Sequence, residues 1–154
     1  MALDTSGEAL REGVRAGPTV VKPNVDELQQ LTGQSLADEA AIEQAARQLL
    51  GDIRLVVISM GERGALFVDA TTTLIATPPQ VQVKSTVGAG DAMVAGLIAG
   101  QVQGLSLSDC ARLATAFSLG AITYAGHNLP APEVLQAYVQ QVSVRISTRV
   151  PRSA

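Results

Sequence analysis

The stretch RLVVISM, from Arg54 to Met60, carries an unbroken apolar run, LVVI, at its centre. A strand with one face in water alternates apolar and polar residues, whereas a continuous run is expected of a strand covered on both faces. Strands of that kind occur in parallel sheets that lie between layers of helices. This one stretch therefore favours an α/β fold over an all-α or an all-β fold.

Predicted helices and predicted strands follow one another along the chain. The spacing of apolar residues, caps and glycines predicts helices over 24–33, 35–51, 91–104, 106–126 and 130–147. Strands are predicted over 18–22 and 54–60, with a hairpin near a sheet edge over 65–70 and 72–77. We predict a layered α/β fold with a mostly parallel sheet flanked by helices. Because ALDTSG at the start resembles the end of a strand and the loop after it, we expect the amino-terminal half of the fold to be missing.

Composition narrows the class of protein. The chain has 154 residues, of which 47% are hydrophobic and 16% charged, values that are typical of one globular domain and not of a disordered chain. Its net charge is −3 and it has no run of Lys or Arg, which argues against nucleic acid or an anionic membrane as the main partner. With a single cysteine, Cys110, and no signal-peptide pattern at the start, a cytoplasmic location is expected.

The most informative motif is TVGAGDAMVAG. Its residues Gly88, Ala89 and Gly90 would let successive backbone N–H groups point at an anion where a helix begins. Asp91 follows at once and has two interpretations. It is either an acidic residue that stabilises the start of the helix, or a general base beside a phosphoryl group held by the N–H groups.

A second motif, KPNVDEL, follows a predicted strand. Lys22 therefore lies where open α/β sheets bind ligands, at the carboxyl end of a strand. Asn24 and Glu27 are three residues apart on a helical turn, so their oxygens could hold a hydrated Mg²⁺ ion. The same two residues also fit a capping box, and the sequence alone leaves both interpretations open.

The third motif, SMGERGA, lies at the end of the apolar strand. Its glycines would let the backbone approach a phosphate group closely. An ordinary hairpin turn explains the same residues. The motif comprises Ser59, Met60, Gly61, Glu62, Arg63 and Gly64.

In this order, Asn-x-x-Glu, Ser-x-Gly-x-x-Gly and Ser-Thr-Val-Gly-Ala-Gly-Asp resemble the motifs of the ribokinase-like sugar kinases, also called the phosphofructokinase B family. The resemblance runs from DTSG to about Ile146 and matches the carboxy-terminal half of that family. Many members have Asp where this chain has Ser85. The sequences KSTVGAGD and VKPN are most similar to the phosphosugar branch, which contains 1-phosphofructokinase, the second type of 6-phosphofructokinase and tagatose-6-phosphate kinase.

The resemblance implies a role for each matching position. Asp91 would deprotonate the sugar hydroxyl, and Gly88 to Gly90 would hold the γ-phosphate. Asn24 and Glu27 would organise Mg²⁺ through waters. Contacts to ATP would come from Lys22, from Ser59 to Gly64 and from Asn128. A monovalent-cation site, for K⁺ in some members, would involve Ser85, Val87, Ala121, Tyr124 and Gly126. His127, the only histidine, is predicted to be a solvated loop residue.

The implied activity is ATP-dependent phosphoryl transfer to a phosphosugar, with fructose 1-phosphate favoured over fructose 6-phosphate, tagatose 6-phosphate or another small alcohol. The family's sugar-binding signature is expected in the half that this chain lacks, so a nucleotide-binding module without catalysis stays open as an alternative. We expect residues 1–147 to form the kinase part and 148–154 a frayed tail. The resemblance also implies homodimers among full-length members.

Overall fold

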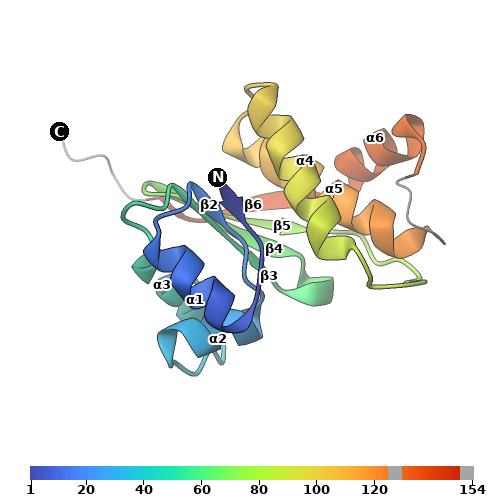
Figure 1. Cartoon of the computed structure of the whole chain (residues 1–154). Helices are drawn as coiled ribbons and strands as arrows, with labels where there is room; N and C mark the ends of the chain where they lie inside the picture. The colour runs from blue at the N-terminus through green and yellow to red at the C-terminus, as the bar shows by residue number, and fades with distance from the viewer. Residues whose placement is uncertain (125–129, 150–154) are drawn as a thin grey trace. The chain divides into compact units, whose positions relative to one another are not determined.

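A computed structural model describes residues 1–124 and 130–149 (Figure 1). Within these residues one sheet has six strands, in the spatial order β1 to β6. The first three, β1 (Ala2–Leu3), β2 (Val20–Val21) and β3 (Leu55–Ser59), pair in parallel. β3 then pairs antiparallel with β4 (Ala65–Val68), and β5 (Thr72–Thr77) and β6 (Ser143–Arg149) complete the order. The predicted α/β class is confirmed, with a mixed sheet.

The chain forms two compact units. Of the described residues, the first comprises 1–60, 65–74 and 146–149. Its helices α1 (Gly7–Arg15), α2 (Val25–Thr32) and α3 (Glu39–Gln48) pack side by side and against strands β1, β3 and β4 (Figure 1). The central residues of β3, Val56 to Ile58, have no exposed surface, as the unbroken apolar run predicts.

The described residues of the second unit are 61–64, 75–124 and 130–145. It contains a single 3₁₀ turn (Gly61–Arg63) and the helices α4 (Ala89–Val102), α5 (Leu107–Thr123) and α6 (Pro132–Gln141). α5 packs against both α4 and α6. Small residues bring α4 and α5 close together: a Cβ atom on Gly96 would lie 2.9 Å from the Cα of Ala114, and one on Gly100 would lie 2.9 Å from the Sγ of Cys110.

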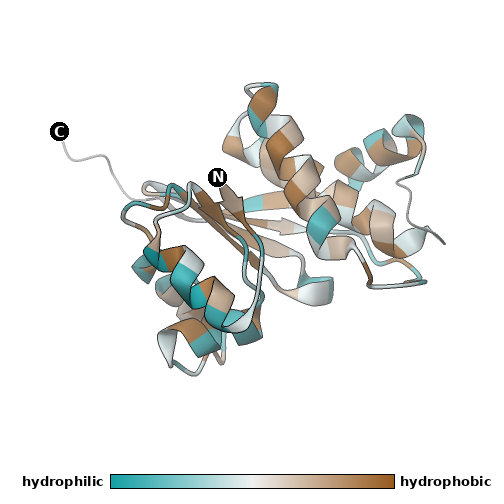
Figure 2. Ribbon diagram, in the orientation of Figure 1, coloured by the Kyte–Doolittle hydropathy of each residue, from teal (hydrophilic) through white to brown (hydrophobic). Residues whose placement is uncertain are grey.

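One predicted helix ends too late, and one helix was not predicted. The helix predicted over 130–147 ends at Gln141, and residues 143–149 form β6, so Thr148 and Arg149 belong to a strand and not to a frayed tail. Helix α1 was not predicted, because glycines at both ends of GEALREG obscure its period. α4 is apolar along most of its length (Figure 2), but it is buried on one side only, since Ile98 and Val102 are 43% and 83% exposed.

The other predicted elements are confirmed with shifted ends. α2 begins after its cap at Asn24 and ends at Gly33, whose φ of +68° is the left-handed conformation that glycine adopts most easily. α5 begins after Ser106, whose hydroxyl accepts a hydrogen bond from the N–H of Asp109. α3 begins after Asp38, later than predicted, because that carboxylate caps the helix. No helix in the described ranges has the length and apolar character that a membrane span requires.

The close contact of α4 with α5 can be tested by Gly96→Ala. In an exposed part of a helix this change would be stabilising, but here the methyl group meets the backbone of Leu113 and Ala114. We expect it to lower the free energy of unfolding by about 1–3 kcal/mol in urea denaturation. Gln101→Ala, at an exposed position of the same helix, should change it by less than about 0.5 kcal/mol. Equal effects of the two variants would contradict the packing.

Candidate active site

In the first unit, parallel pairing brings two of the predicted motifs together. Chain segments that run in the same direction end at the same edge of a sheet, so the residues after β2 lie beside the last residue of β3. The N–H of Ser59 donates a hydrogen bond to the carbonyl of Pro23 at 3.1 Å, and Asn24 and Ser59 form an isolated parallel bridge. Asn24 and Ser59 are therefore neighbours although they are far apart in the sequence.

Asn24 and Glu27 form a complete capping box. Asn24 Oδ1 accepts from the N–H of Glu27 at 2.8 Å, and Glu27 Oε2 accepts from the N–H of Asn24 at 2.8 Å. The capping interpretation is thus confirmed, and the box fixes where both side chains lie. Within residues 1–124 and 130–149, Glu27 Oε1 accepts no hydrogen bond, and the half-buried side chain could bind a water of a cation. Among the described residues there is no cluster of three or more His, Cys, Asp or Glu side chains that could cage a metal. The oxygen donors fit a hydrated Mg²⁺ ion held through waters better than a fully coordinated one.

Lys22 lies at the end of β2 and is buried, with 6% of its surface exposed. Its Nζ lies 3.2 Å from Oδ1 of Asp4, the residue that follows β1. The backbone N–H of Lys22 donates to the carbonyl of Leu3 at 3.1 Å. Sequence reasoning missed Asp4, although the strand-end rule that selected Lys22 applies equally to the aspartate of ALDTSG.

The segment after β3 turns back into β4 through the 3₁₀ turn, which confirms the hairpin interpretation. Met60 is buried, with 7% of its surface exposed, while Gly61 to Arg63 are exposed. The two glycines differ. Gly64, with a φ of +89°, has no room for a side chain, because a Cβ atom would lie 1.9 Å from the carbonyl oxygen of Ala76. Gly61, with a φ of +62°, has open space beside it. Packing thus accounts for Gly64, whereas Gly61 leaves its backbone accessible.

In the second unit, Gly88 is the N-cap of α4 and has a φ of +81°, with no atom within 4 Å of where a Cβ would stand. Ala89, Gly90 and Asp91 form the first turn. The N–H of Ala89 makes a long 3.4 Å hydrogen bond to the carbonyl of Thr86, and first-turn N–H groups have no partner inside a helix. The carboxylate of Asp91 is exposed in this turn. The start of α4 therefore combines a glycine backbone without a side chain, the positive end of the helix dipole and the carboxylate of Asp91.

The loop before α4 lies against the end of α5. The N–H groups of Lys84 and Ser85 donate to the carbonyl of Ile122 at 2.8 and 3.4 Å, and Ser85 Oγ accepts from the N–H of Val87 at 3.2 Å. Three of the predicted cation-site residues, Ser85, Val87 and Ala121, therefore come from two segments that touch. The predicted residues Gly126, His127 and Asn128 lie outside the described residues.

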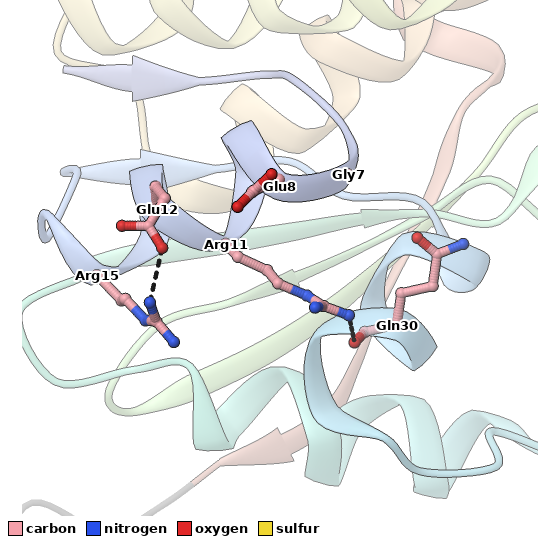
Figure 3. Close-up of a pocket in the computed structure, with 6 residues that line it drawn as sticks. All are labelled: Gly7, Glu8, Arg11, Glu12, Arg15 and Gln30. Carbon is pink, nitrogen blue, oxygen red and sulfur yellow. Dashed lines mark hydrogen bonds and ion pairs between the residues drawn. The ribbon is translucent and has the colours of Figure 1, made fainter.

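A surface hollow of about 510 Å³ lies between α1 and α2 and contains none of the predicted site residues (Figure 3). An ion pair between Arg15 and Glu12 and a hydrogen bond from Arg11 to the carbonyl of Gln30 line it. Cys110 is no candidate nucleophile either. It is buried, and this burial, with the charge of Asp109 as a smaller cause, raises the pKa of its thiol.

Comparison with known proteins assigns the chain to a family. Residues 1–134 match the pattern of the pfkB family carbohydrate kinases. The chain belongs to this family. A 1-phosphofructokinase of Rhodobacter capsulatus is 49% identical over 146 residues, and one of Escherichia coli strain K12 is 41% identical over 143 residues. These alignments cover 94% and 92% of this chain but only 46% of each relative, so the chain spans about half the length of the curated relatives it matches.

Solved structures give the same picture. Phosphofructokinase-2 from Escherichia coli, in complex with substrates and products, superposes with a TM-score of 0.85 at 33% identity, covering 90% of this chain and 46% of that one. A ribokinase from Thermotoga maritima, at 22% identity and a TM-score of 0.68, covers 79% of this chain and 42% of that one and shares the fold. The fold of this pfkB-family chain is therefore ribokinase-like, as predicted.

The capping box gives a testable consequence for the first unit. Asn24→Ala removes the side-chain acceptor for the N–H of Glu27, and we expect a loss of about 1 kcal/mol in the free energy of unfolding. Asn24→Ser keeps a capping oxygen and should lose only a few tenths of that amount. Urea denaturation followed by circular dichroism measures both. Equal losses would show that the cap does not hold the start of α2.

Proposed function

We propose that this chain forms the ATP-binding and phosphoryl-transferring part of a phosphosugar kinase, with fructose 1-phosphate as the favoured acceptor. The observation that carries the proposal is the start of α4, where the exposed Asp91 lies in the first helical turn, after the exposed N-cap glycine Gly88 that has open space beside it. Family membership and relatives named 1-phosphofructokinase support the activity and the choice of sugar.

In the proposed reaction, Asp91 accepts a proton on its carboxylate from the acceptor hydroxyl as that oxygen bonds to the γ-phosphorus. The bond from this phosphorus to the bridging oxygen breaks, and ADP leaves. The first-turn N–H groups of α4 donate hydrogen bonds to the γ-phosphoryl oxygens, where negative charge grows in the transition state. Mg²⁺, when bound, neutralises charge on the phosphates.

Other parts of the chain bind and orient the nucleotide. Glu27 and Asn24, fixed by their capping box, would orient the waters of the Mg²⁺ ion. Lys22 would bind a phosphate group with its ammonium. From the loop after β3, backbone groups of Ser59 to Gly61 and the exposed Glu62 and Arg63 would contact ATP. Gly64 has a packing role, which is reason enough for a glycine there.

Further parts of the proposal concern ions, assembly and location. Phosphofructokinase-2 from Escherichia coli has been solved with potassium and as a tetrameric inhibited form. By likeness, we include a monovalent-cation site built from Ser85, Val87 and Ala121, together with Gly126, and assembly into oligomers, of which the homodimer is the simplest. Asn128 is proposed as a contact to ATP. We also propose that the protein is located in the cytoplasm.

A second candidate, a nucleotide-binding module without catalysis, is favoured by one observation. The chain covers 46% of the relatives' length, so an acceptor pocket built from the rest of those proteins would not be present in these residues. Two measurements on the purified chain separate the candidates. Calorimetric titration with MgATP tests binding, and transfer of radiolabelled phosphate to fructose 1-phosphate, fructose 6-phosphate or tagatose 6-phosphate tests catalysis. Binding with transfer supports the kinase, and binding without transfer supports the module. No binding contradicts both.

The role of Asp91 is tested by Asp91→Ala. We expect phosphoryl transfer to fall by about 10²–10⁴-fold, as for loss of a general base, while the Kd for MgATP changes less than about twofold. Asp109→Ala is a matched control, because Asp109 holds the equivalent third position of α5. The Asp109→Ala variant loses a carboxylate at a helix start, but Asp109 has no part in the proposed reaction. The rate of phosphoryl transfer by this variant should therefore stay near that of wild type. Equal rates for the two variants would remove Asp91 from the mechanism.

A further inference from the structure

None of the sequence motifs includes Asp4, so they give no role to the ion pair between Lys22 and Asp4. Lys22 Nζ lies 3.2 Å from Asp4 Oδ1, and the two side chains are 8% and 28% exposed. An ammonium taken out of water is costly unless an opposite charge or hydrogen-bond acceptors replace its hydration. Asp4 supplies that opposite charge at 3.2 Å.

The ion pair lies near the residues proposed to bind ATP, because of how the strands pair. Asp4 follows β1 and Lys22 follows β2, and these strands pair in parallel, with Leu3 opposite Val21. β2 pairs in the same way with β3, whose end carries Ser59 beside Asn24. The ion pair thus lies on the same edge of the sheet, within the same unit, as the residues proposed to bind ATP and Mg²⁺.

The exposures show how a ligand could reach Lys22. Asp4 is the more exposed partner of the pair, and its neighbour Lys22 keeps 8% of its side chain exposed. A lysine ammonium has three N–H donors, and its charge is attracted to the carboxylate of Asp4 across 3.2 Å. These donors can serve a phosphate group as long as the ion pair keeps the ammonium near Asp4. Without Asp4, the flexible four-carbon stem would no longer be held in one orientation.

We propose that Asp4 is a positioning residue, which holds the Lys22 ammonium in the orientation that binds the phosphates of ATP. This inference rests on the proposed function, because it takes Lys22 as a phosphate-binding residue. Asp4 itself acts through Lys22 and contributes no atom to the reaction.

The test is a double-mutant cycle on the full chain, read by calorimetric titration with MgATP and with adenosine. Asp4→Ala should weaken binding of MgATP about tenfold, the size expected for one charge-assisted hydrogen bond. Adenosine, which has no phosphates, should bind the variant as it binds wild type. In a Lys22→Met background, adding Asp4→Ala should change the affinity for MgATP less than about twofold, because the group that Asp4 positions is already gone.

Two further variants separate positioning from folding and from net charge. Asp4→Asn keeps an acceptor oxygen at the same place, so it should fold where Asp4→Ala fails and should show an intermediate loss of MgATP affinity. Glu12→Ala removes the carboxylate of an exposed ion pair in the same unit, with the same change in net charge, and should leave the affinity unchanged. Circular dichroism checks that each variant is folded.

The outcomes distinguish the inference from the function on which it rests. Equal losses of MgATP affinity from Asp4→Ala with and without Lys22 would mean that Asp4 acts independently of Lys22, and would overturn the inference. Tighter binding by Asp4→Ala or Asp4→Asn would also overturn it, because the carboxylate would then compete with phosphate for the ammonium. Unchanged binding in both variants would overturn the inference alone. Failure of wild type to bind MgATP would overturn the proposed function and the inference together.

Discussion

The parallel pairing of β1, β2 and β3 is the constraint on which the first unit depends. Parallel strands end at a common edge, so the residues that follow them gather there whatever their separation in the sequence. The ion pair of Lys22 with Asp4 and the bridge between Asn24 and Ser59 both follow from this pairing. The apolar run of β3 makes it stable, because Val56 and Val57 are completely buried under the helices that cover the sheet. Burial of the apolar residues of β3 thus stabilises the sheet whose edge carries the polar residues.

In the second unit the corresponding constraint is the close approach of α4 to α5. Gly96 and Gly100 let the two helices touch where larger residues would collide with Ala114 and Cys110. The loop before α4 is tied to the end of α5 through the carbonyl of Ile122. These contacts hold the start of α4, and with it the first-turn N–H groups and the carboxylate of Asp91. A mobile helix start would lose the advantage of preorganised donors.

The glycines of the motifs show what a sequence pattern can and cannot specify. In the sequence, Gly61, Gly64 and Gly88 all resemble positions where the backbone approaches a phosphate. The structure separates them, because Gly64 is pressed against the carbonyl of Ala76 whereas Gly61 and Gly88 have open space beside them. The same holds for Met60, which a motif includes but the core buries. Residues that are distant in the sequence set the space around each of these positions, and a local sequence pattern carries no information about such residues.

Local signals predicted well what local physics controls. The unbroken run at Leu55–Ile58 predicted a strand buried on both faces, and Asn24, Gly33 and Ser106 marked helix ends, because caps depend on residues only a few positions away. The helix predicted over 130–147 was wrong beyond Gln141, because Ser143–Arg149 becomes a strand through its place in the sheet. By itself the sequence determined the α/β class and the family, and it selected candidate site residues that stay predictions. Only the tertiary structure decided that Lys22 is buried against Asp4, because that pairing depends on two strands meeting side by side.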